Sequence, residues 1–259
     1  MDDTELAKVK EDGWYLQFVR EQTPELCLAA VQQSGHTLQY IDEQSTEVCL
    51  AAVRENGRAL KFVKNQTLEI CLAAVQQYGD ALYDVKEHLQ TPTICLAAVQ
   101  QDCYALRFVK KQTPVICLAA VQNNGCALQC VKEQTVEICT AAVKQTGRAL
   151  KYVNNQTLEI CLEAVQETGF ALRYVKEQTP QICLAAIKRT KHAYKYVDTK
   201  MRNILNTNTI TDICLAMYPL RLPSYVLLDI IDLVLNECTL THWAKIHQVI
   251  KINEKKLIR

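Results

Sequence analysis

The chain has 259 residues, a formal net charge of +1 and 49% hydrophobic residues, a composition typical of globular proteins. Net charge this close to zero argues against a protein built mainly to grip nucleic acid. The N-terminus, MDDTELAKVKEDG, lacks the apolar stretch of a secretory signal, and the most apolar run, Tyr225 to Leu235, contains two aspartates and is too short to span a bilayer. We therefore expect a cytoplasmic protein that is neither secreted nor embedded in a membrane.

Residues 1–20 form an incomplete first repeat of a unit that dominates the rest of the chain. Leu6 to Arg20 align with Leu28 to Asp42 at an offset of 22 residues, but Glu5 stands where later units have cysteine and Lys8 replaces an alanine. A stack of repeats needs a polar end unit, because that unit has no neighbour on one side. The segment is predicted to be an N-terminal cap.

Eight complete units follow over residues 21–198, and the first runs from Glu21 to Asp42. Positions in the unit are numbered from 1, with Glu21 at position 1. The step is 22 residues, except for 24 between the cysteines at 71 and 95. The repeated cysteine stands at Cys27, Cys49, Cys71, Cys95, Cys117, Cys139, Cys161 and Cys183. A fixed period of this size is typical of a solenoid.

Each unit begins with the signals of a helix start. Position 3 accepts only hydroxyl residues, such as Thr23 and Ser45, and proline often follows, as at Pro24. A hydroxyl N-cap followed by proline is a strong start signal. The helix is predicted to end at the position-15 glycine in a left-handed conformation. Cys103 and Lys191 replace that glycine, so we expect these two turns to be strained or differently shaped.

A shorter second helix is predicted over residues 37–42, with Leu38 and Ile41 facing inward. Each unit is then a helix–turn–helix hairpin, too small to bury its own apolar face. The predicted fold is an all-α, right-handed solenoid of 22-residue hairpins with a C-terminal helical cap. The two extra residues near Glu87 and His88 are expected to make a local bulge and no new domain.

Two residue types inside the unit allow a structural and a functional interpretation. Glutamine occupies position 2 in all eight units, and we favour a hydrogen-bonded ladder over a row of partner contacts. The repeated cysteines are interpreted as small buried residues in a reducing compartment, because neighbouring helices lie too far apart for disulfides. Cys103, Cys126 and Cys130 lie off this pattern and could gather, but no histidine nearby completes a zinc site. We expect no metal and no cofactor.

Position 19 is predicted to lie on one exposed face, and five of its eight residues are basic. Position 16 varies widely among otherwise similar units, which marks where a partner could be recognised. The candidate partner-binding residues are Lys61, Tyr83, Tyr104, Arg107, Lys151, Phe170, Arg173 and Lys195. A solvated face is the default alternative. A groove for an acidic protein or for a nucleic-acid backbone is the more specific one.

The pattern lapses after residue 198. Residues 199–217 are predicted to be a polar linker with a worn repeat fragment, ICLAM, at Ile213 to Met217. Residues 218–259 are predicted to carry a helix from Ser224 to Leu235 and a second short helix near the end. Such a segment could close the solenoid as a cap.

The repeat core, QTxEICLAAVQQxGxALxYVK, resembles the short tandem repeats of a domain family of unknown function that is abundant in giant, Mimivirus-like DNA viruses of amoebae. The resemblance covers Leu6 to Asp198. It implies a viral protein, acting in the host cytoplasm or the viral factory, and it supplies no catalytic residue.

The tail carries a second resemblance. Residues 222–231, LPSYVLLDII, resemble the opening of an F-box, and similar segments end many poxviral ankyrin-repeat proteins, where they recruit a cullin ubiquitin ligase. The implied contacts with the ligase's linker subunit are Leu222, Pro223, Val226, Leu227 and Ile230. Only part of a box fits in the remaining length, so the alternative of a helical cap stays open.

No Gly-rich phosphate loop, HExxH motif or nucleophile elbow occurs in the sequence. We therefore expect a non-enzymatic scaffold for protein–protein interaction, with no small-molecule substrate. The first alternative is a substrate adaptor of a ubiquitin ligase. The second is binding of a nucleic-acid backbone along the basic face, which the near-zero net charge disfavours.

Overall fold

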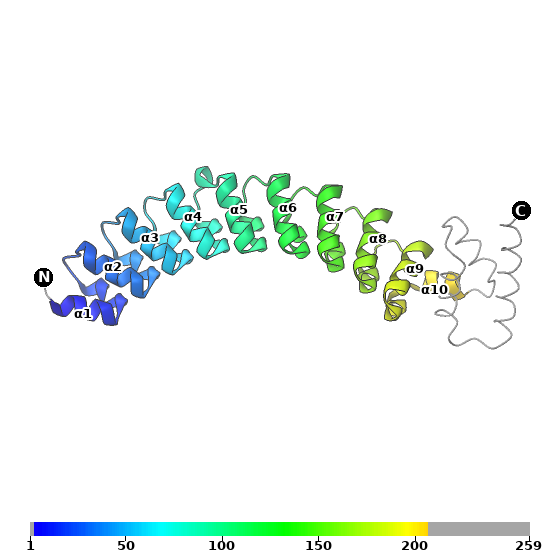
Figure 1. Cartoon of the computed structure of the whole chain (residues 1–259), viewed down its shortest axis with the longest axis horizontal. Helices are drawn as coiled ribbons and strands as arrows, with labels where there is room; N and C mark the ends of the chain where they lie inside the picture. Colours follow the sequence, from blue (N-terminus) through cyan, green and yellow to red (C-terminus); the bar gives the residue numbers. More distant parts are fainter. Residues whose placement is uncertain (1–2, 207–259) are drawn as a thin grey trace, which may run out of the picture. The chain divides into compact units, whose positions relative to one another are not determined.

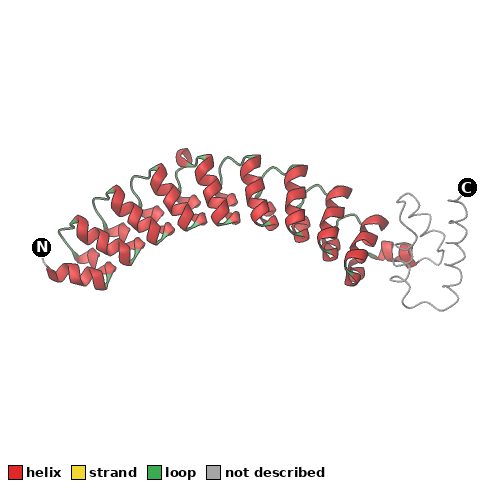
Figure 2. Cartoon of the chain, in the orientation of Figure 1, coloured by secondary structure: helices red, strands yellow, loops and turns green. Residues whose placement is uncertain are grey.

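The computed structural model of the chain describes residues 3–206, which contain helices and no strand (Figures 1 and 2). The worn repeat fragment at Ile213 to Met217 and the predicted tail helices lie outside these residues. The α-helices are α1 (Asp3–Glu11), α2 (Pro24–Gln33), α3 (Thr46–Glu55), α4 (Leu68–Gln77), α5 (Pro92–Gln101), α6 (Pro114–Asn123), α7 (Val136–Gln145), α8 (Leu158–Glu167), α9 (Pro180–Arg189) and α10 (Thr199–Asn206).

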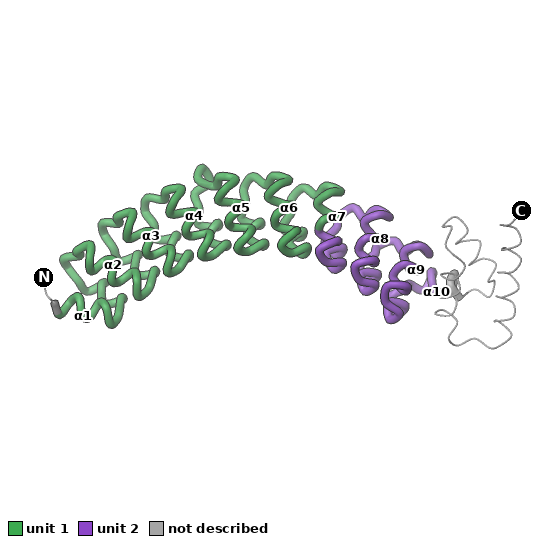
Figure 3. Tube along the Cα trace, viewed as in Figure 1, with its two compact units in different colours: residues 1–141 green, residues 142–259 purple. Residues whose placement is uncertain are grey.

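The chain divides into two compact units, residues 1–141 and 142–259, and the boundary falls within α7 (Figure 3). In the first unit, α2 packs on α3, α3 on α4, and α4 on α5, in chain order. In the second unit, α8 packs on α9 in the same manner. Within residues 3–206 each unit is therefore an all-α solenoid, as the repeat period predicts.

The second helix of each repeat is a six-residue 3-10 helix, a tighter form than the α-helix. In the repeat that contains α3, for example, the N–H of Val63 donates to the carbonyl of Leu60, three residues earlier, at 3.1 Å. These helices are η1 (Gly13–Phe18), η2 (Gly35–Tyr40), η3 (Gly57–Phe62), η4 (Gly79–Asp84), η6 (Cys103–Phe108), η7 (Gly125–Cys130), η8 (Gly147–Tyr152), η9 (Gly169–Tyr174) and η10 (Lys191–Tyr196). Runs this short suit the 3-10 geometry, which closes a hydrogen bond over fewer residues.

Burial within a repeat follows the predicted inward positions. Leu38 and Ile41 are almost fully buried, and so is Thr37, whose hydroxyl donates to the carbonyl of Ser34 at 2.7 Å. In each later repeat an alanine takes the place of Thr37, as at Ala59. Each 3-10 helix packs on the α-helix of its own repeat and on the next one, as η3 does on α3 and α4. The apolar core therefore runs between the two rows of helices.

The helix starts agree with the sequence prediction. The hydroxyl of Thr67 accepts a hydrogen bond from the N–H of Ile70 at 3.3 Å, and that of Ser45 accepts one from Val48 at 3.2 Å. All eight complete repeats carry this cap. The cap satisfies one of the N–H groups that a helix start leaves without an intrahelical partner.

The glycine at position 15 serves close packing, and the predicted left-handed conformation is wrong. The backbone φ lies outside the left-handed region at Gly13, Gly35, Gly57, Gly79, Gly147 and Gly169. A Cβ added at Gly57 would lie only 2.5 Å from the carbonyl oxygen of Ala74 in the next repeat. The N–H of Gly57 also donates to Oε1 of Gln77 at 2.6 Å. Glycine is required because two backbones meet there.

The turns at Cys103 and Lys191 are neither strained nor differently shaped, so that expectation is wrong as well. Each begins a six-residue 3-10 helix, and Asp102 before Cys103 has φ −138° and ψ 113°, close to the −147° and 106° of Tyr78. In the repeat after Cys103, Asn123 replaces the longer glutamine. Its Nδ2 donates instead to the carbonyl of Gln100 at 3.1 Å.

Three predicted boundaries are revised or refined. Residues 3–18 form a hairpin of α1 and η1 with the same form as the later repeats. The N-terminal repeat is therefore more complete than its sequence suggests. Part of the predicted linker is helix α10, because the Asp198 side chain accepts a hydrogen bond from the N–H of Met201 at 2.7 Å and acts as its N-cap. The two extra residues form the short 3-10 turn η5 (Glu87–Leu89), the predicted local bulge.

Within residues 3–206 no helix is long and apolar enough to cross a membrane.

Replacing Thr67 with alanine is predicted to lower the free energy of unfolding by about 1 kcal/mol, because the cap to Ile70 is lost. Thr67→Ser should lower it much less, since Ser45 makes the same bond without a methyl group. Urea denaturation of the three proteins would measure the difference. Equal losses in both variants would show that the threonine is required for packing instead.

Replacing Gly57 with alanine is predicted to destabilise the protein by about 1–3 kcal/mol, the usual range for overpacking. The added Cβ meets backbone that cannot move aside without separating two repeats. Cys103→Ala is the matched control, because position 103 already carries a Cβ. Thermal melts of both variants test this, and a Gly57→Ala protein as stable as the control would contradict the close-packing argument.

Candidate interaction surface

The position-2 glutamines bond backbone groups of their own repeat and, in five repeats, of the preceding one, so they are structural, as predicted. Nε2 of Gln44 donates to the carbonyls of Phe62 at 2.9 Å and of Leu38, in the preceding repeat, at 3.2 Å. Its Oε1 accepts from the N–H of Lys64 at 2.9 Å. Equivalent bonds to the position-20 carbonyl and the position-22 N–H of the same repeat recur at Gln22, Gln66, Gln90, Gln112, Gln156 and Gln178. Bonds to a carbonyl of the preceding repeat, like that of Gln44 to Leu38, recur at Gln90, Gln112, Gln156 and Gln178. These half-buried amides are occupied by backbone groups, so they do not form a row of partner contacts.

Some lysines at position 22 form a second ladder that sequence reasoning missed. Nζ of Lys64 donates to the carbonyl of Asp42 in the preceding repeat at 2.7 Å, and Nζ of Lys176 donates to that of Asn154 at 2.8 Å. Lys132 makes the equivalent bond at 3.2 Å. These ammonium groups donate to backbone carbonyls of the preceding repeat, so the lysines also join neighbouring repeats.

The repeated cysteines are buried and carry free thiols, in agreement with the sequence interpretation. Their thiols also lie near the glutamine amides, an interaction that sequence reasoning missed. Sγ of Cys183, for example, lies 3.4 Å from Oε1 of Gln178. Burial raises the pKa of Cys71 to about 11, and burial, together with the charge of Asp198, raises the pKa of Cys183 to about 12. These thiols are therefore protonated and poorly reactive near neutral pH.

The off-pattern cysteines do not form a metal centre. Cys103 is buried, and Cys126 and Cys130 are half-buried. Burial raises the pKa of the Cys130 thiol, which the charge of Arg107 partly offsets. In the described range, no group of three or more His, Cys, Asp or Glu side chains is arranged to hold a metal ion.

The candidate partner-binding residues all lie on the 3-10 helices. The position-19 side chains are exposed, and Tyr83 is 72% exposed. Phe170 at position 16 is 41% exposed, whereas Tyr104 is half-buried. Within each unit the 3-10 helices pack side by side in chain order, as η3 does on η4 and η8 on η9. The surface that they expose is called the 3-10 face below.

On the 3-10 face each basic residue at position 19 lies over the aromatic ring that follows it in the chain. The distance from the charged group to the ring centroid is 4.6 Å for Lys61 over Phe62 and 4.6 Å for Arg107 over Phe108. In the second unit the pairs are Lys151 over Tyr152 at 5.5 Å, Arg173 over Tyr174 at 4.9 Å and Lys195 over Tyr196 at 4.9 Å. These three pairs are called the basic–aromatic ladder. Sequence reasoning placed its cations but did not recognise the rings beneath them.

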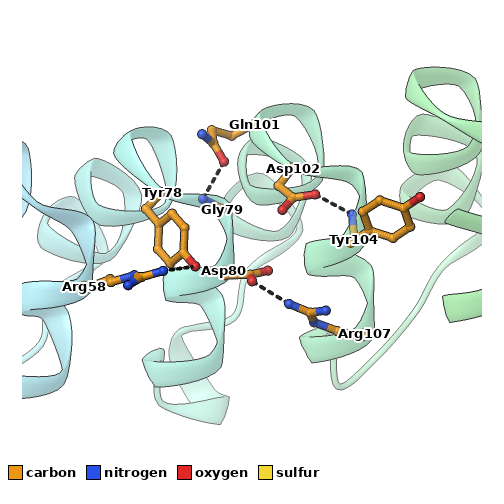
Figure 4. A network of polar contacts seen from close by, with 8 residues as sticks. All are labelled: Arg58, Tyr78, Gly79, Asp80, Gln101, Asp102, Tyr104 and Arg107. Atoms are coloured by element: carbon orange, nitrogen blue, oxygen red, sulfur yellow. Dashed lines mark hydrogen bonds and ion pairs between the residues drawn. The ribbon is translucent and has the colours of Figure 1, made fainter.

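The 3-10 face of the first unit is partly neutralised by η4. Nη2 of Arg107 and Oδ2 of Asp80 form an ion pair at 2.5 Å (Figure 4). Burial raises the pKa of Asp84, which the nearby charge of Lys61 partly offsets. Arg58 lies over the ring of Tyr78 and donates to its hydroxyl at 2.9 Å (Figure 4). Both basic residues at position 19 in this unit therefore have a carboxylate nearby.

Residues 23–67, 46–90, 67–113 and 157–202 each match a family described as Domain of unknown function (DUF4116). Each match spans about two repeats, and together the matches cover more than half of the chain. The chain belongs to this family. A search of curated proteins and a search of solved structures find no match.

The DUF4116 matches end at residue 202, so they do not include the F-box-like segment. Leu222, Pro223, Val226, Leu227 and Ile230 all lie outside the described residues. Contact between these side chains and a ligase subunit stays a prediction, as does the alternative of a cap.

Alkylation of the native protein is predicted to label Cys126 or Cys130 before Cys71 and Cys117. The first two thiols are half-buried and the others are buried. With a pKa of about 11, roughly a thousandth of Cys71 is thiolate at a pH three units lower. Peptide mass spectrometry after timed alkylation tests the order, and rapid labelling of Cys71 or Cys117 would contradict the burial of these thiols.

Proposed function

We propose that this DUF4116 protein is a non-enzymatic scaffold that binds a protein partner through its 3-10 face. The proposal rests on one observation. The residues that recur in all or most repeats make contacts within the fold, whereas the exposed residues that vary gather on the 3-10 helices.

The recurring residues each have a structural role. Threonine or serine caps the helix, as at Thr67; glutamine bonds neighbouring repeats, as at Gln44; and glycine permits close contact, as at Gly57. The cysteine is buried, as at Cys71. In such a solenoid, only surface residues can be substituted without disturbing the contacts between repeats. Partner recognition is then assigned to the surface residues that differ between repeats.

The varied side chains of the 3-10 face suit recognition of a protein. Position 16 carries Arg58, Asp80, Tyr104 and Phe170 in different repeats, and Tyr83 is a large exposed ring at position 19. Aromatic and arginine side chains are enriched among the residues that dominate binding energy at interfaces. The resemblance to repeats of giant DNA viruses suggests that the partner is a host protein. Adaptor activity for a ubiquitin ligase depends on the segment after residue 206 and stays a prediction.

Removing side chains from the 3-10 face is predicted to abolish partner capture. The test variant combines Lys61→Ser and Tyr83→Ser in the first unit with Phe170→Ser and Arg173→Ser in the second. Affinity capture from cells, followed by quantitative mass spectrometry, should show a specific partner with the parent chain and a loss of about tenfold or more in the variant, as expected when several interface anchors are removed.

The control variant carries Arg54→Ser and Lys188→Ser, two exposed basic residues on α3 and α9. It removes as much positive charge as the test variant but leaves the 3-10 face intact, so it should capture the partner normally. Equal capture by both variants would overturn the proposal. Recovery of nucleic acid alone would favour the backbone-binding alternative.

A further inference from the structure

We infer that the basic–aromatic ladder of η8, η9 and η10 binds an extended acidic peptide segment, with one carboxylate at each rung. This inference rests on the proposed function and deepens it, because it names the chemistry of the partner and the part of the 3-10 face that recognises it. The rungs are Lys151 with Tyr152, Arg173 with Tyr174, and Lys195 with Tyr196.

Positive charge on this part of the 3-10 face has no internal partner. The three 3-10 helices read GRALKY, GFALRY and KHAYKY, and they contain no aspartate or glutamate. Lys151, Arg173 and Lys195 are exposed, and within residues 3–206 no carboxylate forms an ion pair with any of them. Arg148 adds a further exposed cation at position 16. Charge complementarity therefore calls for an anionic ligand.

The first unit contains an internal example of the proposed contact. Arg107 lies 4.6 Å over the ring of Phe108 while its Nη2 pairs with Oδ2 of Asp80, a position-16 residue of the preceding repeat (Figure 4). A carboxylate can therefore bind the guanidinium while the ring holds it. In the second unit the equivalents of Asp80 and Arg107 are Arg148 and Arg173. Here the internal carboxylate is replaced by a cation, so the carboxylate must come from a ligand.

The rings already hold the cations in place before any ligand arrives. Arg173 lies within 5.6 Å of the Tyr196 centroid as well as over Tyr174, and Lys195 lies 5.8 Å from the centroid of Phe170. Side chains ordered in this way lose less freedom on binding. The arrangement thus favours recognition of fixed charges over a diffuse electrostatic attraction.

A peptide fits the ladder better than a single-stranded nucleic acid does. Proteins that bind single strands stack the bases on open aromatic faces. Here a cation lies over each ring of the ladder, and Phe170 contacts the Tyr196 ring edge-on, with centroids 6.2 Å apart. Carboxylates need only the cations, which remain exposed.

The repeat period sets the spacing of the acidic residues. Packed helices lie about 8–10 Å apart, and an extended chain advances about 3.3 Å per residue. Successive rungs therefore meet about every third residue of an extended segment. The preferred ligand has aspartate or glutamate at intervals of three.

The test uses the full-length protein and a fluorescent peptide of repeated Ser-Gly-Asp triplets, about 18 residues long, so that it extends past all three rungs. A control peptide of the same composition carries all its aspartates together at one end. Fluorescence anisotropy should show tighter binding of the regularly spaced peptide. Arg148→Asp places a carboxylate in the register of Asp80 and should weaken that binding at least about fivefold, because Arg173 is then paired internally.

Lys188→Asp is the matched control, since it makes the same charge change at an exposed residue of α9 in the same unit, away from the 3-10 face. It should leave the affinity for the spaced peptide unchanged. Arg173→Gln should weaken binding as Arg148→Asp does, and melting curves of all three variants should match the parent chain. Equal affinity for the two peptides, equal effects of Arg148→Asp and Lys188→Asp, or tighter binding of an oligothymidine of equal charge would each overturn the inference.

The two proposals fail separately. If the spaced peptide does not bind the purified chain but a partner is captured in cells through the 3-10 face, the ladder inference is wrong and the proposed function stands. If the peptide binds in register but no protein partner is captured, the proposed function fails while the ladder is supported as an acidic-peptide site.

Discussion

The hydrogen bonds of the position-2 glutamine close each hairpin and, in five repeats, tie it to the preceding one. A six-residue 3-10 helix cannot satisfy its own last carbonyl groups, and the glutamine at the start of the same repeat bonds the last of them, as Gln44 does at Phe62. The amide of Gln44 accepts from one backbone group and donates to two others, one of them at Leu38 in the preceding repeat. Because an unpaired buried backbone group destabilises a fold by roughly 1–3 kcal/mol, every repeat depends on this one side chain.

The same bonds explain why the surface can vary freely. Register is set by backbone contacts, through Gln44 on one side of the hairpin and through Gly57 on the other. No side chain at position 16 or 19 takes part in these contacts. Substitutions there leave the frame intact, so residues as different as Asp80 and Phe170 occupy equivalent places. Stability and the proposed recognition of a partner thus depend on different residues of each repeat.

The two units of the chain share a fold and differ in the charge of their 3-10 faces. In the first unit, Asp80 and Asp84 on η4 lie near the basic residues of the neighbouring repeats. In the second unit no acidic residue occurs on η8, η9 or η10. Two residues of one repeat, Asp80 and Asp84, therefore account for this difference in charge.

The sequence by itself determined the period, the helix starts and the burial pattern, because each depends on local chemistry. A hydroxyl at position 3 caps a helix whatever surrounds it, and the inward residues Leu38 and Ile41 follow from spacing along one helix. The exposed candidates at position 19 could also be predicted, since their repetition places them on one face.

Only the tertiary structure decided what depends on the neighbouring repeat. The position-15 glycine matches a helix-ending signal in sequence, yet its reason is the carbonyl of the next repeat, as at Ala74 beside Gly57. The pairing of Arg107 with Asp80 joins residues 27 apart in the chain, and the rings beneath the cations matter only because the 3-10 geometry brings them together. Contacts of this kind depend on the distance and orientation between neighbouring repeats, which the sequence of a single repeat does not show.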